Sequence, residues 1–505
     1  MDQLSAGLEK VINDNDGELV TANLCDVTAG SVTAVASSWR SGVVVVARGT
    51  ELSIHDSNAL EDAARVAFNE RDNSGATSPN VQASPAARLP WAELSAKDST
   101  AARTTVPLPS ACTTLVLDEE HESLAIGCAD GQVLVARHIA HIIRTGATAL
   151  APVNTECGKG QMLLAWAGGM LLCTPGDSSN CGFFDWDGNE LARLDASSGT
   201  SSVTAVAGSP FSSLNRALFA IGRADGSAEV ACFTSDGGCA PTAGSVEVVA
   251  KGELNLPGES GAGSVEALTW VSSTGLAAVR RVGLGGDASL QLIPVGFTSS
   301  PSGSSRAGGS LVVGGGEGFD PEDFPTWHLL GDVAPPMANG QGKQHVSLAT
   351  MGPLVVCASG TSAPTAPRAR AYKVAHEGGE SGAESGEGAP RLRECGEWLE
   401  LPTSLGSGGG GAMAVAFGLQ SSTALGVRDP FRSGEGELAA PVSVFCALRD
   451  GTLAVNGVLC AGKLDTAECN CAPFQPAVPS LPGMRKSRFA GVHAPLLRMC
   501  VCTHQ

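Results

Sequence analysis

A six-residue sequence that occurs twice constrains the fold of this chain more than any other feature. SVTAVA stands at residues 31–36 and again at residues 202–207. Each copy opens the same pattern: an apolar run, a turn rich in Ser, Pro or Gly, a second apolar run, a second turn and a third apolar run. Short β-forming runs bounded by turn residues predict the antiparallel strands of a meander. The hexapeptide is therefore interpreted as the start of a structural repeat.

The same pattern recurs along the chain. Asp-Gly pairs at Asp130–Gly131, Asp225–Gly226 and Asp450–Gly451 each lie between two strand-like runs. Asp-Gly favours the type I′ turn, so these pairs predict hairpins. The shortest spacings between units, about 40 residues, match one blade of a β-propeller. Repeat units are predicted to begin near residues 31, 112, 162, 202, 264, 346 and 412.

We therefore predict an all-β fold, a seven-bladed β-propeller that is WD40-like but divergent, with long Gly/Ser-rich loops. Radial repetition lets each four-stranded sheet bury both faces against its neighbours. The 64 glycines fit a chain with many turns. Periodic Trp-Asp strand endings are absent, because Trp186–Asp187 lies in a predicted turn. A pair of β-sandwiches with similar hairpins is the alternative.

The 505 residues exceed what one compact core usually holds, and a closed repeat architecture accommodates this length. We expect an N-terminal extension over residues 1–24, the propeller over 25–460 and an irregular C-terminal tail over 461–505. One helix is predicted over residues 57–72, with Ser57 as its N-cap. Gly/Ser/Pro-rich insertions, predicted to be disordered, lie near residues 71–90, 298–310 and 376–391.

The net charge of −19, from 51 acidic and 32 basic residues, repels phosphate backbones. It argues against direct nucleic-acid binding, and it suits either a basic protein partner or solubility alone. Residues 1–16 lack the apolar core of a secretory signal. The longest apolar stretch, residues 162–173, is too short to cross a bilayer. We expect an intracellular protein without membrane insertion, whose 16 cysteines are mostly reduced, buried thiols.

The sequence shows no pattern typical of an active site. The phosphate-binding Gly-x-x-x-x-Gly-Lys-Ser/Thr loop, the Gly-x-Ser-x-Gly nucleophile turn and the His-Glu-x-x-His zinc helix are all missing. We therefore expect no enzyme and no cofactor. A zinc site is weighed and not predicted, since Cys-x-Cys spacing is poor for zinc. Its possible ligands would be Cys460, Cys469, Cys471, Cys500, Cys502 and His504.

An acidic turn supplies the candidate residues for contact with a partner. Asp118, Glu119 and Glu120 fall in a predicted hairpin loop between two strands of one unit. A loop of this kind is expected to be solvated. These three carboxylates are thus the predicted partner-binding residues, and no catalytic or metal-binding residue is predicted.

Four segments together resemble a known family. They are residues 31–60, 112–138, 324–337 (FPTWHLLGDVAPPM) and 397–419, the last followed by PVSVFCALRDGTLAV. In their order along residues 25–460 they are similar to the N-terminal β-propeller of the cytoplasmic-face nucleoporin that binds the mRNA-export DEAD-box RNA helicase. The likeness lies in strand order and sparse motifs. The single Phe-Gly dipeptide, Phe417–Gly418, falls in a predicted strand.

The resemblance implies a non-catalytic docking platform in the nuclear pore complex. Its partners would be the DEAD-box RNA helicase and other nucleoporins, and its place the cytoplasmic face of the pore in the nuclear envelope. An acidic rim would be steered toward a basic helicase surface that also binds RNA. A generic intracellular propeller scaffold for another protein complex is the alternative. An enzyme using the propeller channel is a third reading. The hexapeptides in the predicted inner strands carry only Ser, Val, Thr and Ala, which argues against that reading.

Overall fold

The computed structural model of the chain falls into two compact units, Met1–Phe474 and Gln475–Gln505. Every described residue lies in the first unit, and the account below is confined to it. The structure describes residues 19–28, 32–38, 42–57, 60, 64, 66, 88–90, 103–118, 122–139, 142, 150–153, 160–195, 200–210, 212, 216–235, 246–254, 263–272, 275–281, 286, 288–298, 310–313, 328–329, 346–351, 354–359, 369–376, 390–393, 399–400, 412–419, 427–428, 437–448 and 451–460.

Several expectations fall outside these ranges. The insertions predicted near 71–90, 298–310 and 376–391 lie outside the described residues, apart from strand residues at their ends. The predicted tail at 461–505 lies outside them entirely. The first strand begins at residue 19 and spans the expected boundary at residue 25.

The described strands form seven sheets, which we number as blades 1 to 7. Blade 1 contains β2 (Val32–Ser38), β3 (Val43–Arg48), β4 (Glu51–Asp56) and β6 (Arg103–Pro107), and blade 2 contains β7 (Cys112–Asp118), β8 (Ser123–Cys128), β9 (Val133–Ala136) and β10 (Leu150–Val153). Blade 3 contains β11 (Met162–Ala167), β12 (Met170–Pro175), β13 (Cys181–Phe184) and β14 (Glu190–Leu194), and blade 4 contains β15 (Val203–Gly208), β16 (Arg216–Arg223), β17 (Ala228–Ser235) and β18 (Val246–Leu254). Blade 5 contains β19 (Ser264–Ser272), β20 (Gly275–Arg281), β21 (Ala288–Thr298), β22 (Ser310–Val313) and β23 (His328–Leu329). Blade 6 contains β24 (Val346–Met351), β25 (Leu354–Ser359), β26 (Ala369–His376), β27 (Pro390–Arg393) and β28 (Leu399–Glu400). Blade 7 contains β29 (Ala412–Leu419), β30 (Val427–Arg428), β31 (Glu437–Leu448), β32 (Thr452–Cys460), β1 (Leu19–Thr28) and β5 (Arg88–Pro90).

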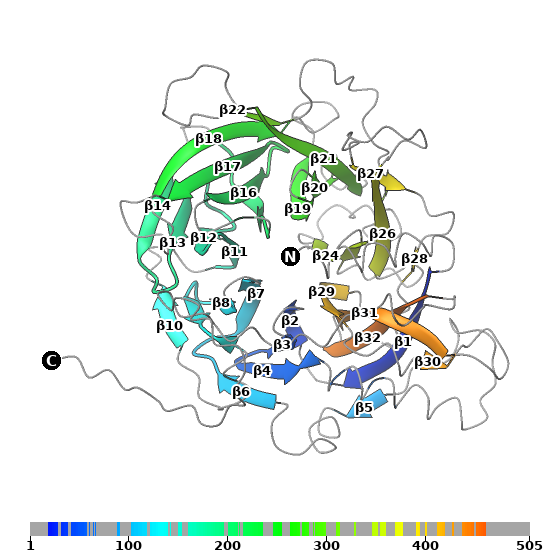
Figure 1. The fold of residues 1–505 in the computed structure, drawn as a ribbon. Helices are drawn as coiled ribbons and strands as arrows, with labels where there is room; N and C mark the ends of the chain where they lie inside the picture. The colour runs from blue at the N-terminus through cyan, green and yellow to red at the C-terminus, as the bar shows by residue number, and fades with distance from the viewer. Residues whose placement is uncertain are drawn as a thin grey trace, which may run out of the picture. The chain divides into compact units, whose positions relative to one another are not determined.

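The seven sheets of this unit are arranged around a common centre (Figure 1). The first strand of each sheet lies innermost and contacts the first strands of the sheets before and after it, from β2 through β7, β11, β15, β19 and β24 to β29 and back to β2. These inner strands begin at, or one residue after, the predicted unit starts. The described part of the chain is therefore a β-propeller, and the predicted fold class is confirmed.

Blade 7 joins the two ends of the described chain. β1 pairs antiparallel with β32 from Leu19↔Cys460 to Thr28↔Thr452. Val27 on β1 is fully buried. Blade 7 is thus completed by a strand that precedes blade 1 in the sequence.

Each hydrophobic core cluster lies between two successive blades. Blades 1 and 2 share one cluster, and similar clusters lie between blades 2 and 3, 3 and 4, 4 and 5, and 5 and 6. Between blades 3 and 4 the Phe183 and Phe233 ring centroids are 4.4 Å apart, and Phe219 packs edge-on against Phe183. A second strand covered on both faces cannot alternate polar and apolar residues. This explains the continuous apolar run Val43–Val46 in β3.

The Asp-Gly turns form hairpins, but the predicted turn type is wrong. In the turns that begin at Cys128 and Arg223, the Gly131 and Gly226 N–H groups donate to the carbonyl oxygens of those first residues, at 3.0 and 3.1 Å. Only the glycines have positive φ, 87° and 85°, so each Gly occupies the fourth turn position. This is a type I turn with a glycine bulge, where a type I′ turn needs positive φ at two central residues.

The predicted helix is described at four positions. Ser57, Leu60, Ala64 and Val66 have helical conformation. Leu60 and Ala64 are buried and Val66 is 48% exposed, as expected for one face of a helix lying on the propeller.

The threonine of the hexapeptide links neighbouring blades. Thr204 lies at a register shift in β15, and its Oγ1 donates to Val265 O in blade 5 at 2.5 Å. Thr33, at the same position in blade 1, donates to Cys112 O in blade 2 at 2.9 Å. The repeated residue therefore hydrogen-bonds one inner strand to the next.

Candidate partner-binding surface

The acidic turn predicted to contact a partner begins at a buried residue. Asp118 is the last residue of β7, opposite Ser123 on β8, and is 6% exposed. The expectation of a solvated turn is therefore wrong for Asp118, which still belongs to the β7 strand and is buried. Glu119 and Glu120 lie outside the described residues, and their contact with a partner stays a prediction.

The end of this turn lies beside the segment that follows β9. The Ile139 N–H donates to the Glu122 carbonyl oxygen at 3.1 Å. Just before Ile139, Arg137 and His138 are both exposed, and His138 has a left-handed φ of 55°. The turn and this segment therefore share one end of blade 2.

The β13–β14 hairpin of blade 3 has an internally hydrogen-bonded turn. Asp185 Oδ1 accepts the backbone N–H groups of Asp187 at 2.8 Å and of Asn189 at 2.9 Å. Asp185 Oδ2 accepts Asn189 Nδ2 at 2.9 Å, and Gly188 supplies the positive φ of 83°. An Asp at the first position of a turn typically bonds its own backbone in this way. The sequence DWDGN therefore fixes the position of Trp186.

This turn packs closely against blade 2. A Cβ on Gly188 would lie 3.0 Å from both the Pro152 carbonyl oxygen and the Val153 Cα of β10. A side chain at this position would require a shift of the backbone. The positive φ of Gly188 also disfavours any residue other than glycine. The close approach brings the Trp186–Asp187 turn against the outer part of blade 2.

Side chains of the two blades meet at this junction. Arg137 Nη2 lies 2.7 Å from Asp187 Oδ1, with side chains 41% and 68% exposed. Arg137 Cζ lies 5.8 Å from the centroid of the half-buried Trp186 ring. We name Arg137, His138, Trp186 and Asp187 the blade 2–3 surface. Sequence reasoning missed it, because the two halves are joined only through the packing of blade 3 on blade 2.

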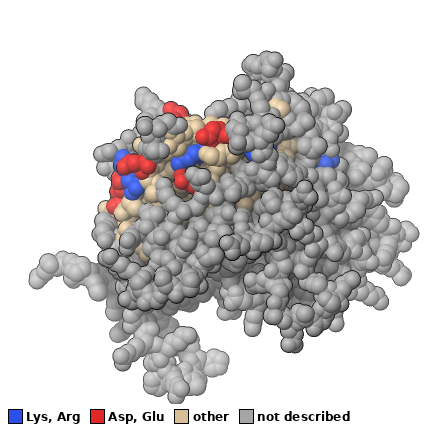
Figure 2. Space-filling view, turned by 90° about the horizontal axis from the view of Figure 1, so that it is seen from above, with Lys and Arg blue, Asp and Glu red and all other residues tan. Residues whose placement is uncertain are grey.

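The charges on the described part of the surface are mixed. Figure 2 shows acidic and basic residues side by side, without a large area of one sign. One such neighbouring pair is Arg193 and Glu190 on β14, whose Nη2 and Oε2 atoms are 2.7 Å apart. Exposed pairs of this kind contribute little to stability.

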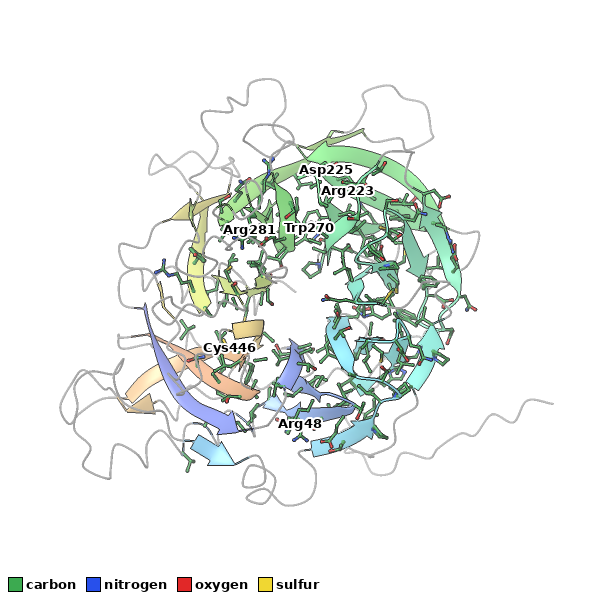
Figure 3. The ribbon with its side chains drawn as sticks, turned by 180° about the vertical axis from the view of Figure 1, so that it is seen from behind. Arg48, Arg223, Asp225, Trp270, Arg281 and Cys446 are labelled. Carbon is green, nitrogen blue, oxygen red and sulfur yellow. The ribbon has the colours of Figure 1, made fainter. Side chains whose placement is uncertain are left out.

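Buried ion pairs lie at the turns between second and third strands. Arg223 Nη2 is 2.5 Å from Glu229 Oε1, and Arg223 Nη1 donates to the carbonyl oxygens of Ser179 at 3.2 Å and Ser201 at 3.0 Å. Arg223 thus ties blade 3 to blade 4. Although burial acts to raise it, hydrogen bonds from Ser227 hold the pKa of nearby Asp225 below its usual value. Figure 3 shows Arg223 and Asp225 together in blade 4.

The corresponding turn of blade 5 contains a bidentate pair. Arg281 Nε donates to Glu266 Oε1 at 2.6 Å and Arg281 Nη2 to Glu266 Oε2 at 3.2 Å. Arg281 Nη1 donates to Gly286 O at 3.0 Å, and the two side chains are 3% and 10% exposed. The arginine is labelled in Figure 3. Glu266 occupies in β19 the position that Thr204 occupies in β15. Its ion pair with Arg281 joins the inner strand to the second strand of the same blade, whereas Thr204 bonds to the next blade.

The described cysteine side chains are buried, and burial raises the pKa of three of them. Burial raises the pKa of Cys112 to about 12, with a smaller contribution from Cys128, and burial with nearby Asp130 raises that of Cys128 to about 11. Burial also raises the pKa of Cys357. Thiols of this kind are poor nucleophiles. None of the seven cysteines whose side chains are described forms a disulfide, and all seven are buried.

Within the described ranges, no group of three or more His, Cys, Asp and Glu residues could hold a metal ion. Of the six residues weighed as zinc ligands, Cys460 ends β32 and the other five lie outside those ranges. In the same part of the chain no helix is long and apolar enough to span a bilayer.

No known protein family and no curated protein matches the chain. Among solved structures, the N-terminal domain of Nup159 is similar at 10% identity and a TM-score of 0.45, over 88% of this chain and 96% of that chain. The β-propeller domain of Cps50 (Swd1) from Myceliophteria thermophila has 10% identity and a TM-score of 0.44, over 87% and 99%. The WD40 repeats of RRP9 have 10% identity and a TM-score of 0.44, over 85% and 94%. The fold assignment rests on the strand pairing of this chain itself.

Proposed function

We propose that this chain is a non-catalytic docking platform for a protein partner, and that the blade 2–3 surface is part of the binding site. The observation that carries this proposal is Trp186, half-buried beneath the exposed Arg137, which Asp187 holds in place. Trp and Arg are the residues most enriched where interfaces concentrate binding energy. Here both are presented by the ends of a rigid two-blade junction, so little conformational entropy is lost on binding.

We further propose that the partner is the mRNA-export DEAD-box RNA helicase, at the cytoplasmic face of the nuclear pore complex. The ordered likeness of four segments to the helicase-binding nucleoporin propeller supports this partner. The net charge of −19 favours a partner with a basic protein surface over a nucleic-acid partner. Glu119 and Glu120, between Asp118 and Glu122, are proposed as additional contacts. Other nucleoporins would be further partners of such a platform.

Titration calorimetry of the full chain against the organism's own mRNA-export helicase tests this function. We expect a Kd in the micromolar range or tighter, which rises with salt because exposed charges are screened. Single-stranded RNA should compete for the helicase. Absence of heat, with the propeller shown to be folded by circular dichroism, contradicts the helicase as partner. Pull-down would then identify the complex that a generic scaffold serves.

A variant pair tests the surface separately from the partner. Trp186→Ala should weaken binding by about 30-fold, since interface Trp residues commonly contribute about 2 kcal/mol or more. Arg193→Ala, which breaks an exposed ion pair on β14 of the same blade, should leave the Kd unchanged. Equal Kd values for Trp186→Ala and the unmodified protein would exclude the blade 2–3 surface while leaving the helicase as partner.

A further inference from the structure

Two cysteines stand directly opposite each other in blade 2. The register of β7 and β8 pairs Cys112 with Cys128. Among all residue pairs in the described ladders, this is the only one that joins two cysteines. Both side chains belong to the core cluster between blades 1 and 2, so they project from the same face of the sheet. The two thiols therefore lie side by side within one hairpin.

The backbone geometry brings these cysteines close. The Cys112 N–H donates to Gly49 O at 2.8 Å, and the Cys128 N–H donates to Gln132 O at 2.9 Å. Because neither N–H bonds across the pair, Cys112 and Cys128 form a non-hydrogen-bonded pair, in which Cα atoms are about 4.5 Å apart. Disulfides span Cα separations of about 4.4–6.8 Å. The pair lies beside the register shift between Cys112 and Thr114, and the spacing of a pair of this kind is within the range that a disulfide spans.

The equivalent pairs in other blades show that the fold does not need cysteine here. Val32 pairs with Arg48 in blade 1, Val203 with Arg223 in blade 4, and Val265 with Arg280 in blade 5. An apolar residue on the inner strand satisfies the position in each of these blades. At this paired position, blade 2 is the only described blade that has a cysteine on both the first and the second strand.

We propose that Cys112 and Cys128 are a modification site, at which a peroxide oxidises the two thiols to an intramolecular disulfide that covalently closes the β7–β8 hairpin.

The chemistry balances with one peroxide. The Cys128 thiolate attacks one oxygen of hydrogen peroxide, the O–O bond breaks, and the departing hydroxide takes the thiol proton to form water. The resulting sulfenic acid on Cys128 is attacked by the Cys112 sulfur. The S–S bond forms as the S–O bond breaks, and the leaving hydroxide takes the Cys112 proton as a second water. Two thiols lose two electrons and two protons, and the peroxide is reduced to two waters.

The surroundings make this reaction slow and pH-dependent. Cys112 and Cys128 are 1% and 0% exposed, so a peroxide reaches them only when the hairpin end opens. Ala129 and Asp130, in the β8–β9 turn that follows Cys128, are exposed. With pKa values raised to about 12 and about 11, few thiolates exist at neutral pH, and Cys128 supplies the larger share. We expect the rate of disulfide formation to increase with pH between 7 and 9, because the thiolate fraction increases.

Peptide mapping of the peroxide-treated full chain tests the proposal. Trypsin releases residues 104–137 as one peptide that contains Cys112 and Cys128 and no other cysteine. After denaturation and alkylation without reductant, we expect this peptide to be unalkylated and two hydrogen atoms lighter. Cleavage at Glu119, Glu120 or Glu122 should leave its halves joined until a reductant is added.

The same digest contains a matched control. Residues 160–193 form a tryptic peptide that contains only Cys173 and Cys181. Both are buried, but they belong to different core clusters on opposite faces of blade 3. This peptide should remain fully alkylated. Free thiols in residues 104–137, sulfinic or sulfonic acid there, or equal disulfide content in the two peptides would overturn the proposal.

Thermal unfolding gives a second readout. Oxidation should raise the midpoint temperature by a few degrees, because the disulfide restricts a 17-residue loop of the unfolded chain. Cys112→Val, the residue that blades 1, 4 and 5 carry at this position, should fold and show no oxidative shift. An equal shift in the variant and the unmodified protein would contradict a disulfide at this pair.

Discussion

Thr33 and Thr204, the third residues of the two hexapeptide copies, make equivalent bonds in blades 1 and 4. Each hydroxyl donates to a carbonyl oxygen at the start of the next inner strand, Cys112 O in β7 and Val265 O in β19. The sequence identity of the copies predicted a repeat, but it could not predict that the threonine hydroxyl would form a hydrogen bond to the next blade. The acceptor of Thr204, Val265 O, is 61 positions away, and only the ring arrangement brings it within reach. In blade 5 the same position holds Glu266, which changes the interaction from a hydroxyl bond to a buried ion pair.

Glu266→Gln should therefore destabilise the protein strongly. Arg281 is 3% exposed, and the substitution removes the carboxylate charge that its buried guanidinium faces. Removing one member of a buried pair typically costs about 3–5 kcal/mol in the free energy of unfolding. Urea denaturation measures the change. Glu190→Gln, in the exposed pair with Arg193, is the control and should cost less than about 1 kcal/mol. Similar losses in the two variants would show that Glu266 has no special role.

Among the strands, the turn chemistry could be predicted only in part. Asp-Gly pairs correctly marked the hairpins after β8 and β16, whereas Gly168–Gly169 form the turn between β11 and β12. Gly168 and Gly169 both have positive φ, 54° and 76°, so a two-residue turn with positive φ at both positions does occur there. The contact that decides how closely two blades approach was not predictable. Gly208 at the end of β15 lies against the Trp166 backbone in β11, and no local sequence pattern predicts this contact.

Gly208→Ala should disrupt the packing of blade 4 on blade 3. A Cβ on Gly208 would overlap the Trp166 carbonyl oxygen, and a backbone atom cannot turn aside as a flexible side chain can. Strain of this kind typically costs about 1–3 kcal/mol or more, so the thermal midpoint should fall by several degrees. Gly176→Ala is the control, since its nearest atom would be an ordinary 3.7 Å away. Equal midpoints in the two variants would contradict the close approach.

At the scale of the whole propeller, repetition predicted the inner strands and missed the closure. Each unit of the sequence suggested its own sheet, and the inner strands begin where the units were expected to begin. Nothing in residues 19–28 marks them as the partner of residues 452–460. Pairing across that separation depends on the ring as a whole, because both segments are adjacent only after the other blades have formed. The candidate surface was missed for a related reason, since Arg137 and Trp186 come from different blades.

Deletion of residues 1–28 should therefore open blade 7. Without β1, β32 presents an unpaired edge, and edges of this kind associate with other chains. Size-exclusion chromatography should show larger species, and the thermal midpoint should fall. A synthetic peptide of residues 19–28 should restore the monomer and the midpoint, while a peptide of the same composition in scrambled order should not. A monomeric deletion variant with an unchanged midpoint would show that the β1–β32 pairing is dispensable.

The pairing of β1 with β32 also has a consequence for synthesis of the chain. β1 leaves the ribosome before the other described strands, and Thr452, where β32 begins, follows more than four hundred residues later. At translation rates of about 5–20 residues per second, β1 waits about 20 to 90 seconds for its partner. Blades 1 to 6 can form during this interval, but the ring cannot close. A nascent chain that stalls before Thr452 therefore keeps an open ring, so the propeller closes only after β32 has been synthesised.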